Sequence, residues 1–289
     1  GQGEENGMTE KCRRLAGKIA IVTGAGTTQA RDNFGTGQAI ALLFARQGAK
    51  VLVADLDADR AELTRQTILA EGGEAAVVRA NVAEEAGCRA MVEACVKEYG
   101  GVHVLVNNAG AGASGTVPDI GAADFDLAVD VNIKGAAMAA KYAIPVMAEA
   151  GGGSIINITS IDGMRTGGIR NVPYSVAKAG LSHLSTLMAC HHGHQNIRSN
   201  CIAPGHIYGS YVHNFLTPDI RERRRRAAPL GTEGNAWDVA WAAVFLASDE
   251  ARWISGIVLP VDGGLATATP LAMFDAIEGG DNGARGEVG

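Results

Sequence analysis

Short apolar segments alternate with longer amphipathic segments along most of the chain. The apolar segments are rich in β-branched residues and almost continuous in apolar side chains, which is typical of strands covered on both faces. They predict seven strands, at Lys18–Val22, Lys50–Ala54, Glu74–Arg79, Val102–Val106, Ser154–Ile158, Arg198–Ile202 and Ile257–Val261. The amphipathic segments predict helices, at Gly37–Gln47, Arg60–Ala70, Cys88–Tyr99, Ala128–Met147, Pro173–Cys190 and Ala236–Leu246.

Repeated alternation of strand and helix favours a parallel sheet with right-handed crossovers and helices on both faces. The predicted fold class is therefore α/β, a single doubly wound domain of the Rossmann type with a seven-stranded parallel sheet. We expect it to span 15–264, and we interpret 206–234 as a substrate lid or loop. Residues 265–289 are interpreted as a tail. Residues 1–14 are interpreted as a leader, in part a cloning remnant or a disordered segment.

Composition excludes several classes of protein. The net charge of -6 gives no basic surface for nucleic acid. No run of about 18 apolar residues is present, so no membrane span is expected. The five cysteines include no C-x-x-C pair, which fits reduced thiols in a cytoplasmic protein. We therefore expect a cytoplasmic protein whose partner is a small molecule.

A glycine-rich loop follows the first predicted strand. Gly24 closes that strand, and Gly35, Thr36 and Gly37 open the first predicted helix. Glycines at such positions let the backbone turn tightly and approach a pyrophosphate, whose charge is favoured at a helix N-terminus. A loop between a strand and a helix is the context that a dinucleotide site requires.

Asp55 closes the second predicted strand, 18 residues after Gly37. A carboxylate there can accept hydrogen bonds from the ribose hydroxyls of an adenosine, and it repels a 2′-phosphate. This favours NAD over NADP as the cofactor. In the alternative interpretation, Asp55 only caps the following helix.

Tyr174 and Lys178 are four residues apart on a predicted helix, so they share one face. A nearby ammonium and a positively charged nicotinamide both lower the pKa of a phenol. Tyr174 can then take a proton from an alcohol, or donate one to a ketone, while hydride is exchanged with the cofactor. Ser160 follows the fifth predicted strand and can donate a hydrogen bond to the substrate oxygen, with Thr159 as the alternative hydroxyl.

The order of these motifs resembles that of the short-chain dehydrogenase/reductase family, over about residues 15–264. The motifs are Thr23-Gly24 with Gly35 and Gly37, Asn107-Asn108-Ala109-Gly110, Asn132 in Asn-Ile-Lys-Gly, Ser160, Tyr174 with Lys178, Pro204-Gly205, and Asp262-Gly263-Gly264. Each motif is weak alone, and the ordered set is specific. The resemblance implies catalytic roles for Asn132, Ser160, Tyr174 and Lys178.

The resemblance also implies a cofactor site beyond the glycine-rich loop. Tyr174 and Lys178 are expected to contact the cofactor as well as the substrate. The backbone of Asn132 is expected to hold a water that links Lys178 to solvent. Asn81 and Val82 stand where the family has an Asp-Val pair facing the adenine. The other residues implied are Asn108, Ala109 and Gly110 beside the adenosine, and Pro204, Gly205 and Ile207 beside the nicotinamide.

The chain departs from the family pattern at two loops. Ala25–Phe34 places ten residues after Gly24 where the family has three. The extra residues form either a flap in which Arg31 pairs with a phosphate, which can also favour NADP, or a surface bulge. Gly209 stands where the family commonly has a threonine, and we expect Ser210 to replace it.

The lid carries two further features of interest. Tyr208, Tyr211, Phe215 and Leu216 suggest a partly hydrophobic substrate. The basic run Arg221–Arg226 either attracts an acidic substrate or a carrier's phosphate, or forms the solvated face of a short helix. His191, His192 and His194 lack further ligands nearby, so no metal is expected.

The function that these features favour is NAD-dependent interconversion of a secondary alcohol, such as a cyclic alcohol, polyol or dihydrodiol, and its ketone. The alternatives are a 3-oxoacyl-carrier reductase or a steroid dehydrogenase of the same family, and a dinucleotide-binding protein without turnover. The resemblance implies a homotetramer or dimer. The small residues Gly135–Ala140 permit close helix packing, within one chain or between chains.

Overall fold

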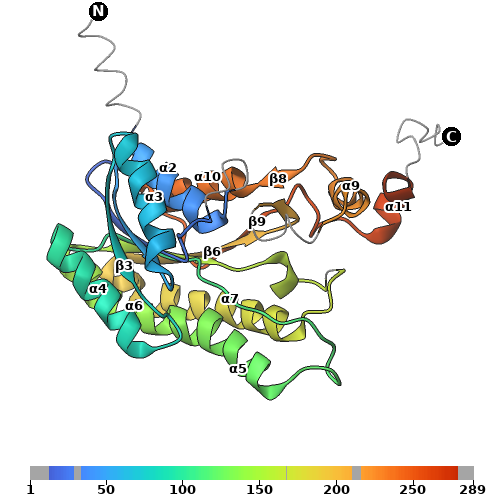
Figure 1. Ribbon diagram of the computed structural model, residues 1–289, viewed down its shortest axis with the longest axis horizontal. Helices are drawn as coiled ribbons and strands as arrows, with labels where there is room; N and C mark the ends of the chain where they lie inside the picture. The colour runs from blue at the N-terminus through green and yellow to red at the C-terminus, as the bar shows by residue number, and fades with distance from the viewer. Residues whose placement is uncertain (1–12, 29–33, 167, 210–215, 279–289) are drawn as a thin grey trace, which may run out of the picture.

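The computed structural model describes residues 13–28, 34–166, 168–209 and 216–278. At its centre lies a seven-stranded sheet in the order β3-β2-β1-β4-β5-β6-β9, with all neighbouring strands parallel (Figure 1). The predicted doubly wound α/β fold is confirmed. The strands are β1 (Ile19–Thr23), β2 (Lys50–Asp55), β3 (Glu74–Arg79), β4 (Val104–Asn107), β5 (Gly153–Ile158), β6 (Ile197–Pro204) and β9 (Val258–Val261).

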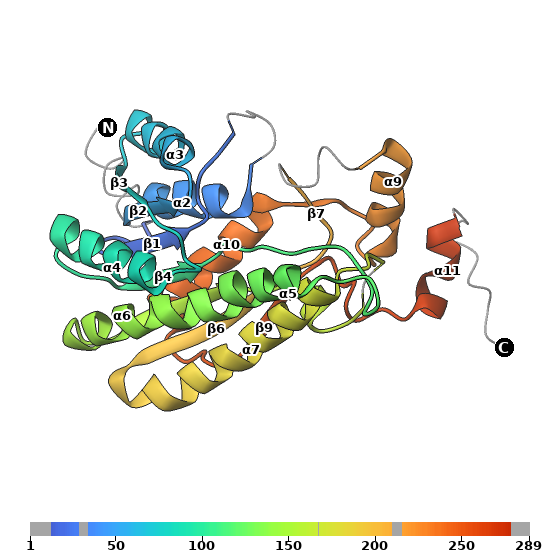
Figure 2. The same ribbon diagram turned by 60° about the horizontal axis from the view of Figure 1, so that its bottom comes forward.

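Helices cover both faces of the sheet. One layer contains α2 (Thr36–Arg46), α3 (Ala58–Ala70) and α10 (Ala236–Ala247), and the other contains α4 (Glu85–Tyr99), α6 (Gly135–Glu149) and α7 (Val172–His192) (Figures 1 and 2). Alternate residues of a strand point to opposite faces. Ala20 and Val22 therefore pack in the core on the first side, and Ile19 and Ile21 in the core on the second. Two buried faces explain why these strands are continuously apolar.

The helix predicted from Ala128 to Met147 is longer and less regular in the structure. It begins as α5 (Ala122–Val129), continues through a single π-helical turn, η1 (Asp130–Lys134), and ends as α6. A π turn inserts an extra residue into the helix and shifts the side chains that follow around the axis. It also places Asn132, which is 1% exposed, inside the molecule.

The small residues at the start of α6 pack within the chain. Gly135, Ala136, Ala139 and Ala140 are buried, and α6 lies directly against α4. A Cβ at Gly135 would lie 2.8 Å from the carbonyl oxygen of Val82. The small residues of Gly135–Ala140 therefore provide close packing within one chain, which is one of the two alternatives that the sequence left open.

The stretch between β6 and α10 contains short elements of its own. They are β7 (Ile207–Tyr208), α9 (Pro218–Ala227) and β8 (Gly234–Asn235), and β7 pairs with β8. The chain ends, within the described residues, in α11 (Pro270–Glu278), which lies against α9. Figure 2 shows α9 and α11 beside each other, beyond the main body of the sheet. No helix in the described ranges is long and apolar enough to span a membrane.

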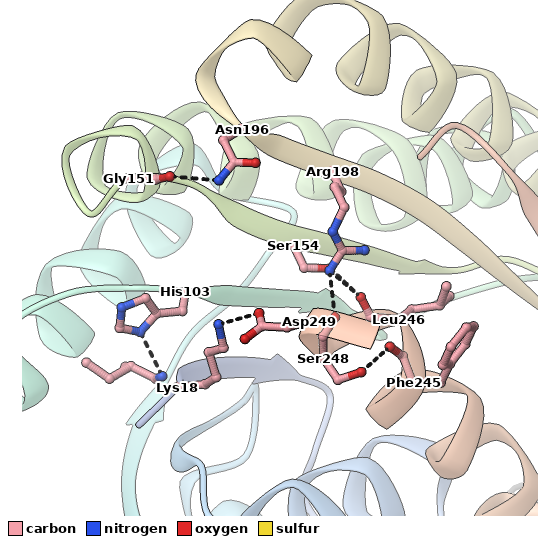
Figure 3. Close-up of polar contacts among 11 residues, drawn as sticks. Lys18, His103, Gly151, Ser154, Asn196, Arg198, Phe245, Leu246, Ser248 and Asp249 are labelled. Carbon is pink, nitrogen blue, oxygen red and sulfur yellow. Dashed lines mark hydrogen bonds and ion pairs between the residues drawn. The ribbon is translucent and has the colours of Figure 1, made fainter. Parts of the chain in front are cut away.

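Arg198 ties the C-terminal end of α10 to the sheet (Figure 3). Its guanidinium donates hydrogen bonds to the carbonyls of Leu246 at 2.7 Å, Ser248 at 3.3 Å and Ile254 at 3.4 Å. Ser154 Oγ donates a second bond to the Leu246 carbonyl, at 2.9 Å. The last carbonyls of a helix have no partner within it, and these side chains supply one. Burial lowers the pKa of Arg198, and nearby Asp249 opposes this shift.

We expect Arg198→Met to lower the free energy of unfolding by about 1.5–3 kcal/mol, because it removes the hydrogen bonds that a charged group donates to three carbonyls. Urea unfolding followed by circular dichroism measures the change. Arg252→Met is the matched control, since Arg252 is exposed and lies between Ser248 and Ile254 in the sequence, and it should change stability by less than about 0.5 kcal/mol. Equal effects of the two substitutions would show that the Arg198 contacts contribute little.

Candidate active site

A cavity of about 990 Å³ lies at the carboxyl ends of the central strands. Its lining comes from the loop after β1, the ends of β2, β4, β5 and β6, the start of α7, and α9. In open α/β sheets, ligands bind outside the carboxyl ends of the strands, where the strand order reverses. The β1–β4 pairing at the centre of the sheet is such a reversal.

The glycine-rich loop is held by Thr23 and Asn108. Asn108 Nδ2 donates to the carbonyls of Thr23 at 2.9 Å and Gly24 at 3.0 Å. Thr23 Oγ1 accepts from the backbone N–H groups of Asn108 and Ala109, both at 3.0 Å. Gly24 has φ +61, and a Cβ at Gly37 would overlap the Gly24 carbonyl oxygen. The loop thus requires glycine at both positions.

The start of α2 faces the cavity without a side-chain cap. Gly35 is the N-cap residue and makes no side-chain bond, while Gly35, Thr36 and Gly37 all line the cavity. The first N–H groups of a helix have no partner within it and attract an anion. A narrow glycine cradle with free N–H groups fits the pyrophosphate of a dinucleotide.

Asp55 lies at the end of β2 and lines the same cavity. Its carboxylate accepts from the backbone N–H of Gly26 at 2.8 Å and from that of Asp57 at 3.0 Å. The helix cap is Asp57, which accepts from the N–H groups of Asp59 and Arg60. Asp55 therefore fixes the glycine loop rather than capping α3, and a carboxylate has acceptor sites left for a ligand.

The predicted adenine-side residues lie on two sides of the cavity. Asn108, Ala109 and Gly110 follow β4, and Asn81 and Val82 follow β3. The side chain of Asn81 already has partners, because Nδ2 donates to Glu84 Oε1 at 2.9 Å and Oδ1 accepts from the Ala83 N–H at 3.1 Å. The amide thus shapes the turn after β3, which presents Val82 to the cavity.

Tyr174 and Lys178 lie in the first two turns of α7. Lys178 is 3% exposed, and its Nζ donates to the Ile158 carbonyl at 2.8 Å. That Nζ lies 5.5 Å from the centroid of the Tyr174 ring. Burial lowers the pKa of Lys178 to about 8, and Cys201 opposes this shift. A Cβ at Gly112 would lie 2.9 Å from Tyr174 Cβ, so this glycine lets the tyrosine pack against the backbone after β4.

Asn132 approaches Lys178 from the π turn. Its Nδ2 donates to the carbonyls of Ala111 at 2.6 Å and Ala128 at 2.8 Å, while its Oδ1 is buried and has no partner in the described structure. A Cβ at Gly110 would lie 3.1 Å from that Oδ1 and 3.4 Å from Lys178 Nζ. The two polar atoms therefore lie on the same side of Gly110.

Ser160 and Thr159, after β5, differ in their bonding. Thr159 Oγ1 donates to the Ile202 carbonyl at 3.0 Å, so its proton is engaged inside the molecule. Ser160 Oγ accepts from the Asp162 N–H at 3.1 Å, at the start of the short 3-10 helix η2 (Ile161–Gly163). Ser160 thus keeps its hydroxyl proton for a ligand, and it is the better candidate of the two.

Comparison with known proteins identifies the family. A family model described as enoyl-(acyl carrier protein) reductase matches residues 30–266. The 7alpha-hydroxysteroid dehydrogenase of Escherichia coli K12 is 38% identical over 252 residues, which are 87% of this chain and 95% of that protein. The 2,5-dichloro-2,5-cyclohexadiene-1,4-diol dehydrogenase of Sphingobium indicum is 36% identical over 252 residues, with 87% and 97% covered. The chain belongs to the short-chain dehydrogenase/reductase family.

A solved structure supports the same assignment. The 7alpha-hydroxysteroid dehydrogenase complexed with NADH and 7-oxo glycochenodeoxycholic acid has a TM-score of 0.82 and 37% identity to this chain, covering 88% of it and 96% of that chain. The short-chain dehydrogenase/reductase described here is an oxidoreductase with the family's Rossmann-type fold.

In this short-chain dehydrogenase/reductase, the described ends of the two unusual loops lie side by side. The ring of Phe34, at the end of the long glycine loop, lies 4.9 Å from that of Trp237 on α10. A Cβ at Gly209 would lie 2.9 Å from the Phe34 carbonyl oxygen, so Gly209 lies against the end of that loop. Arg31, Ser210, Tyr211 and Phe215 lie outside the described residues.

The predicted nicotinamide-side residues lie together after β6. Pro204, Gly205 and Ile207 line the cavity, and the Ile207 N–H donates to the Gly205 carbonyl at 2.8 Å. The histidines predicted not to bind metal are at the other end of α7, where His192 Nδ1 bonds Gln195 Oε1 at 2.8 Å. Within the described ranges no cluster of His, Cys, Asp and Glu suits a metal ion.

The cavity lining also contains polar residues to which the sequence analysis gave no individual role. Among them are Asp162, Asn171, His206 and Arg224. Asn171 Nδ2 donates to Asp162 Oδ2 at 2.9 Å. His206 directly follows the Pro204-Gly205 motif, so its position was available from the sequence. Arg224 lies in a run of arginines that look alike in the sequence, and only the fold shows that it is the one that lines this cavity.

The buried ammonium of Lys178 predicts a pH dependence of stability. An unfolded lysine has a pKa near about 10.4, whereas the folded pKa is about 8. Between these values the unfolded state binds more protons, so this group makes the free energy of unfolding rise with pH. This contribution is absent in Lys178→Met. The free energy of unfolding of the wild type minus that of the variant should therefore increase by up to about 3 kcal/mol between about pH 7.5 and about pH 10.5.

Urea unfolding at a series of pH values measures this difference. The thiols of Cys88 and Cys95, whose pKa values burial raises, are common to both proteins and cancel in the subtraction. Cys201 interacts electrostatically with Lys178, so both proteins carry Cys201→Ala. Lys97→Met, at an exposed position, is the control and should differ from wild type by a constant. A constant difference for Lys178→Met as well would contradict a depressed pKa at this site.

Proposed function

We propose that this enzyme interconverts a secondary alcohol and its ketone by hydride transfer with NAD(H), with Tyr174 as the general acid and base. The observation that carries the proposal is the convergence of Tyr174, Lys178 and Ser160 on the cavity that the glycine cradle also lines. The 7alpha-hydroxysteroid dehydrogenase that resembles this chain binds NADH in its solved complex, which supports the choice of cofactor.

We assign a different group of cavity residues to each part of the cofactor. Gly24, Gly35, Thr36 and Gly37 hold the pyrophosphate, and the carboxylate of Asp55 accepts from the adenosine ribose. Asn81, Val82, Asn108, Ala109 and Gly110 surround the adenosine, and Pro204, Gly205 and Ile207 line the nicotinamide. When bound, NAD supplies the acceptor or donor of the hydride.

The protein supplies the proton transfer. The Ser160 hydroxyl donates a hydrogen bond to the substrate oxygen and so holds that oxygen beside Tyr174. In alcohol oxidation, the Tyr174 phenolate takes the hydroxyl proton, and in ketone reduction the phenol donates it. The Lys178 ammonium favours the phenolate electrostatically. In this proposal, a water bound beside Asn132 and Lys178 passes the proton on to solvent, and the unpartnered Oδ1 of Asn132 supports such a water.

The substrate class proposed is a cyclic secondary alcohol or its ketone. The two named relatives are dehydrogenases of a hydroxysteroid and of a cyclohexadiene diol, so both act on a hydroxyl attached to a ring. The cavity combines apolar side chains such as Leu127, Val131 and Ile161 with the polar groups near Ser160. A 3-oxoacyl-carrier reductase is less favoured, since Asp55 repels the 2′-phosphate of NADPH. A binding protein without turnover has no use for Tyr174 and Lys178 together.

We also propose that 206–234 is a lid over this cavity and that subunits associate as a dimer or tetramer. Within that segment, Ile207 and Arg224 line the cavity. For association, Trp253 is 91% exposed and Trp241 on α10 is 48% exposed. Trp253 lies in the segment that leads from α10 to the edge strand β9. Large exposed apolar side chains can mark a protein contact surface.

Tyr174→Phe should lower kcat by at least about 10³-fold while NADH binding stays within about two-fold, because only the proton donor is lost. NADH absorbance with a panel of acyclic and cyclic secondary alcohols, diols and ketones measures turnover. Tyr142→Phe, which removes an exposed hydroxyl bonded to Glu85, is the control and should keep full activity. If the wild type binds NADH and turns over nothing in a broad panel, the enzyme proposal fails.

Asp55 should make NADH bind at least about ten-fold more tightly than NADPH, a difference of about 1.4 kcal/mol. Asp55→Asn keeps an acceptor for the Gly26 N–H and removes the charge, so the ratio should fall. Asp57→Asn retains a helix cap and should leave the ratio unchanged. Fluorescence titration measures both affinities. Tighter binding of NADPH by the wild type would overturn the assignment of NAD.

A further inference from the structure

The lid side of the cavity carries charged and polar groups that hydride transfer does not use. His206 and Arg224 line it from the segment after β6 and from α9. Asp162 faces them from the strand-end loop, two residues after Ser160 and hydrogen-bonded to Asn171 just before Tyr174. Arg224 and His206 both interact electrostatically with Asp162. They therefore lie on the side of the site where Ser160 and Tyr174 meet the substrate.

The arginines of α9 divide into two kinds. Arg221 pairs with Glu233. Arg225 and Arg226 both pair with Glu222, each at 2.7 Å. These contacts belong to the solvated surface of a short helix. Arg223 is exposed, and Arg224 alone in this run lines the cavity and is half-buried.

The charge of Arg224 has no close counter-ion in the described part of the chain. Its one hydrogen bond runs from Nη2 to the Ile207 carbonyl, at 3.4 Å. Burial lowers its pKa, and the attraction of Glu233 and Asp162 opposes this shift without forming an ion pair. A partly desolvated guanidinium has four other N–H donors and is stabilised most by an anion that binds two of them.

His206 contributes a neutral group beside this cation. Its Nδ1 contacts the Arg224 carbonyl oxygen at 3.5 Å. Burial and the charge of Arg224 lower the pKa of His206 below its ordinary value, which favours the neutral ring. A neutral imidazole that donates from Nδ1 to this carbonyl keeps Nε2 as an acceptor, so the donors available to an anion are those of Arg224.

We propose that Arg224, with His206 beside it, binds a carboxylate carried by the substrate at a distance from its ketone or hydroxyl. The inference rests on the proposed function, since it places a second anchor in the same site. Ser160 and Tyr174 hold the reacting oxygen, and Arg224 holds the anionic end. The substrate is then a ring-containing hydroxy acid or keto acid rather than a neutral alcohol.

The test compares keto acids with their uncharged amides. A series of cyclic keto acids, with increasing numbers of carbons between the ring ketone and the carboxylate, is titrated by calorimetry into the enzyme loaded with NAD⁺, which cannot donate a hydride to the ketone. Each acid is matched with its primary amide. The proteins are the wild type, Arg224→Gln, and Arg223→Gln as an exposed control from the adjacent position.

We expect at least one acid to bind the wild type ten-fold or more tightly than its amide. The preference should fall below about two-fold in Arg224→Gln and persist in Arg223→Gln. The proposal is overturned if the wild type prefers no acid in the series, or if Arg224→Gln keeps the preference. A ten-fold loss of NADH affinity in Arg224→Gln without ketone would also overturn it, by assigning the guanidinium to a cofactor phosphate.

Turnover of the same compounds separates this inference from the function it rests on. If acids bind through Arg224 and are never reduced, the proposed hydride transfer is contradicted and the anion site is supported. Reduction of acids and amides with equal KM in the wild type would sustain the proposed function and refute the anion site.

Discussion

Burial of the Lys178 ammonium is the constraint on which the catalytic site depends. A cation removed from water must be hydrogen-bonded to remain charged, and here the Ile158 carbonyl at the end of β5 supplies the bond. That bond fixes the start of α7 against the sheet. Tyr174, one turn earlier, is thereby held near the ammonium. Because burial lowers the pKa of Lys178 to about 8, the proton on this lysine is held loosely enough to exchange near neutral pH.

Close backbone approach makes that burial possible. Gly112 lets Tyr174 pack on the chain after β4, and Gly110 leaves a space between Lys178 and Asn132. A Cβ at Gly163 would lie 2.8 Å from the backbone of Lys178 and Ala179, so the same helix also packs closely on η2. Side chains at Gly112 and Gly163 would push α7 away from the strand ends, and one at Gly110 would crowd the amide of Asn132. The glycines of the site therefore act through packing, whereas Gly24 acts through its left-handed backbone.

The strands and the Tyr174–Lys178 pair were predictable, because hydrophobic runs and a four-residue spacing are local features of a sequence. The π turn at Asp130–Lys134 was not, since its residues also suit an α-helix, and only packing around Asn132 selects it. The engagement of Asn81 with Glu84 was missed for a related reason, because the family position suggested a contact with the ligand. Arg224 points toward the cavity because of the way α9 packs on the rest of the molecule, and the local sequence Arg221–Arg226 does not encode that packing.

The site separates reaction chemistry from substrate choice along the chain. Ser160, Tyr174 and Lys178 sit at strand ends and the first turns of α7, where the core determines their positions. His206 and Arg224 sit beyond β6, on short elements joined to the body by the two-residue pairing of β7 with β8. Few contacts hold such elements, so their side chains can change without disturbing the proton transfer. In the proposed function, a charge placed there selects the substrate, and its removal leaves the hydride chemistry intact.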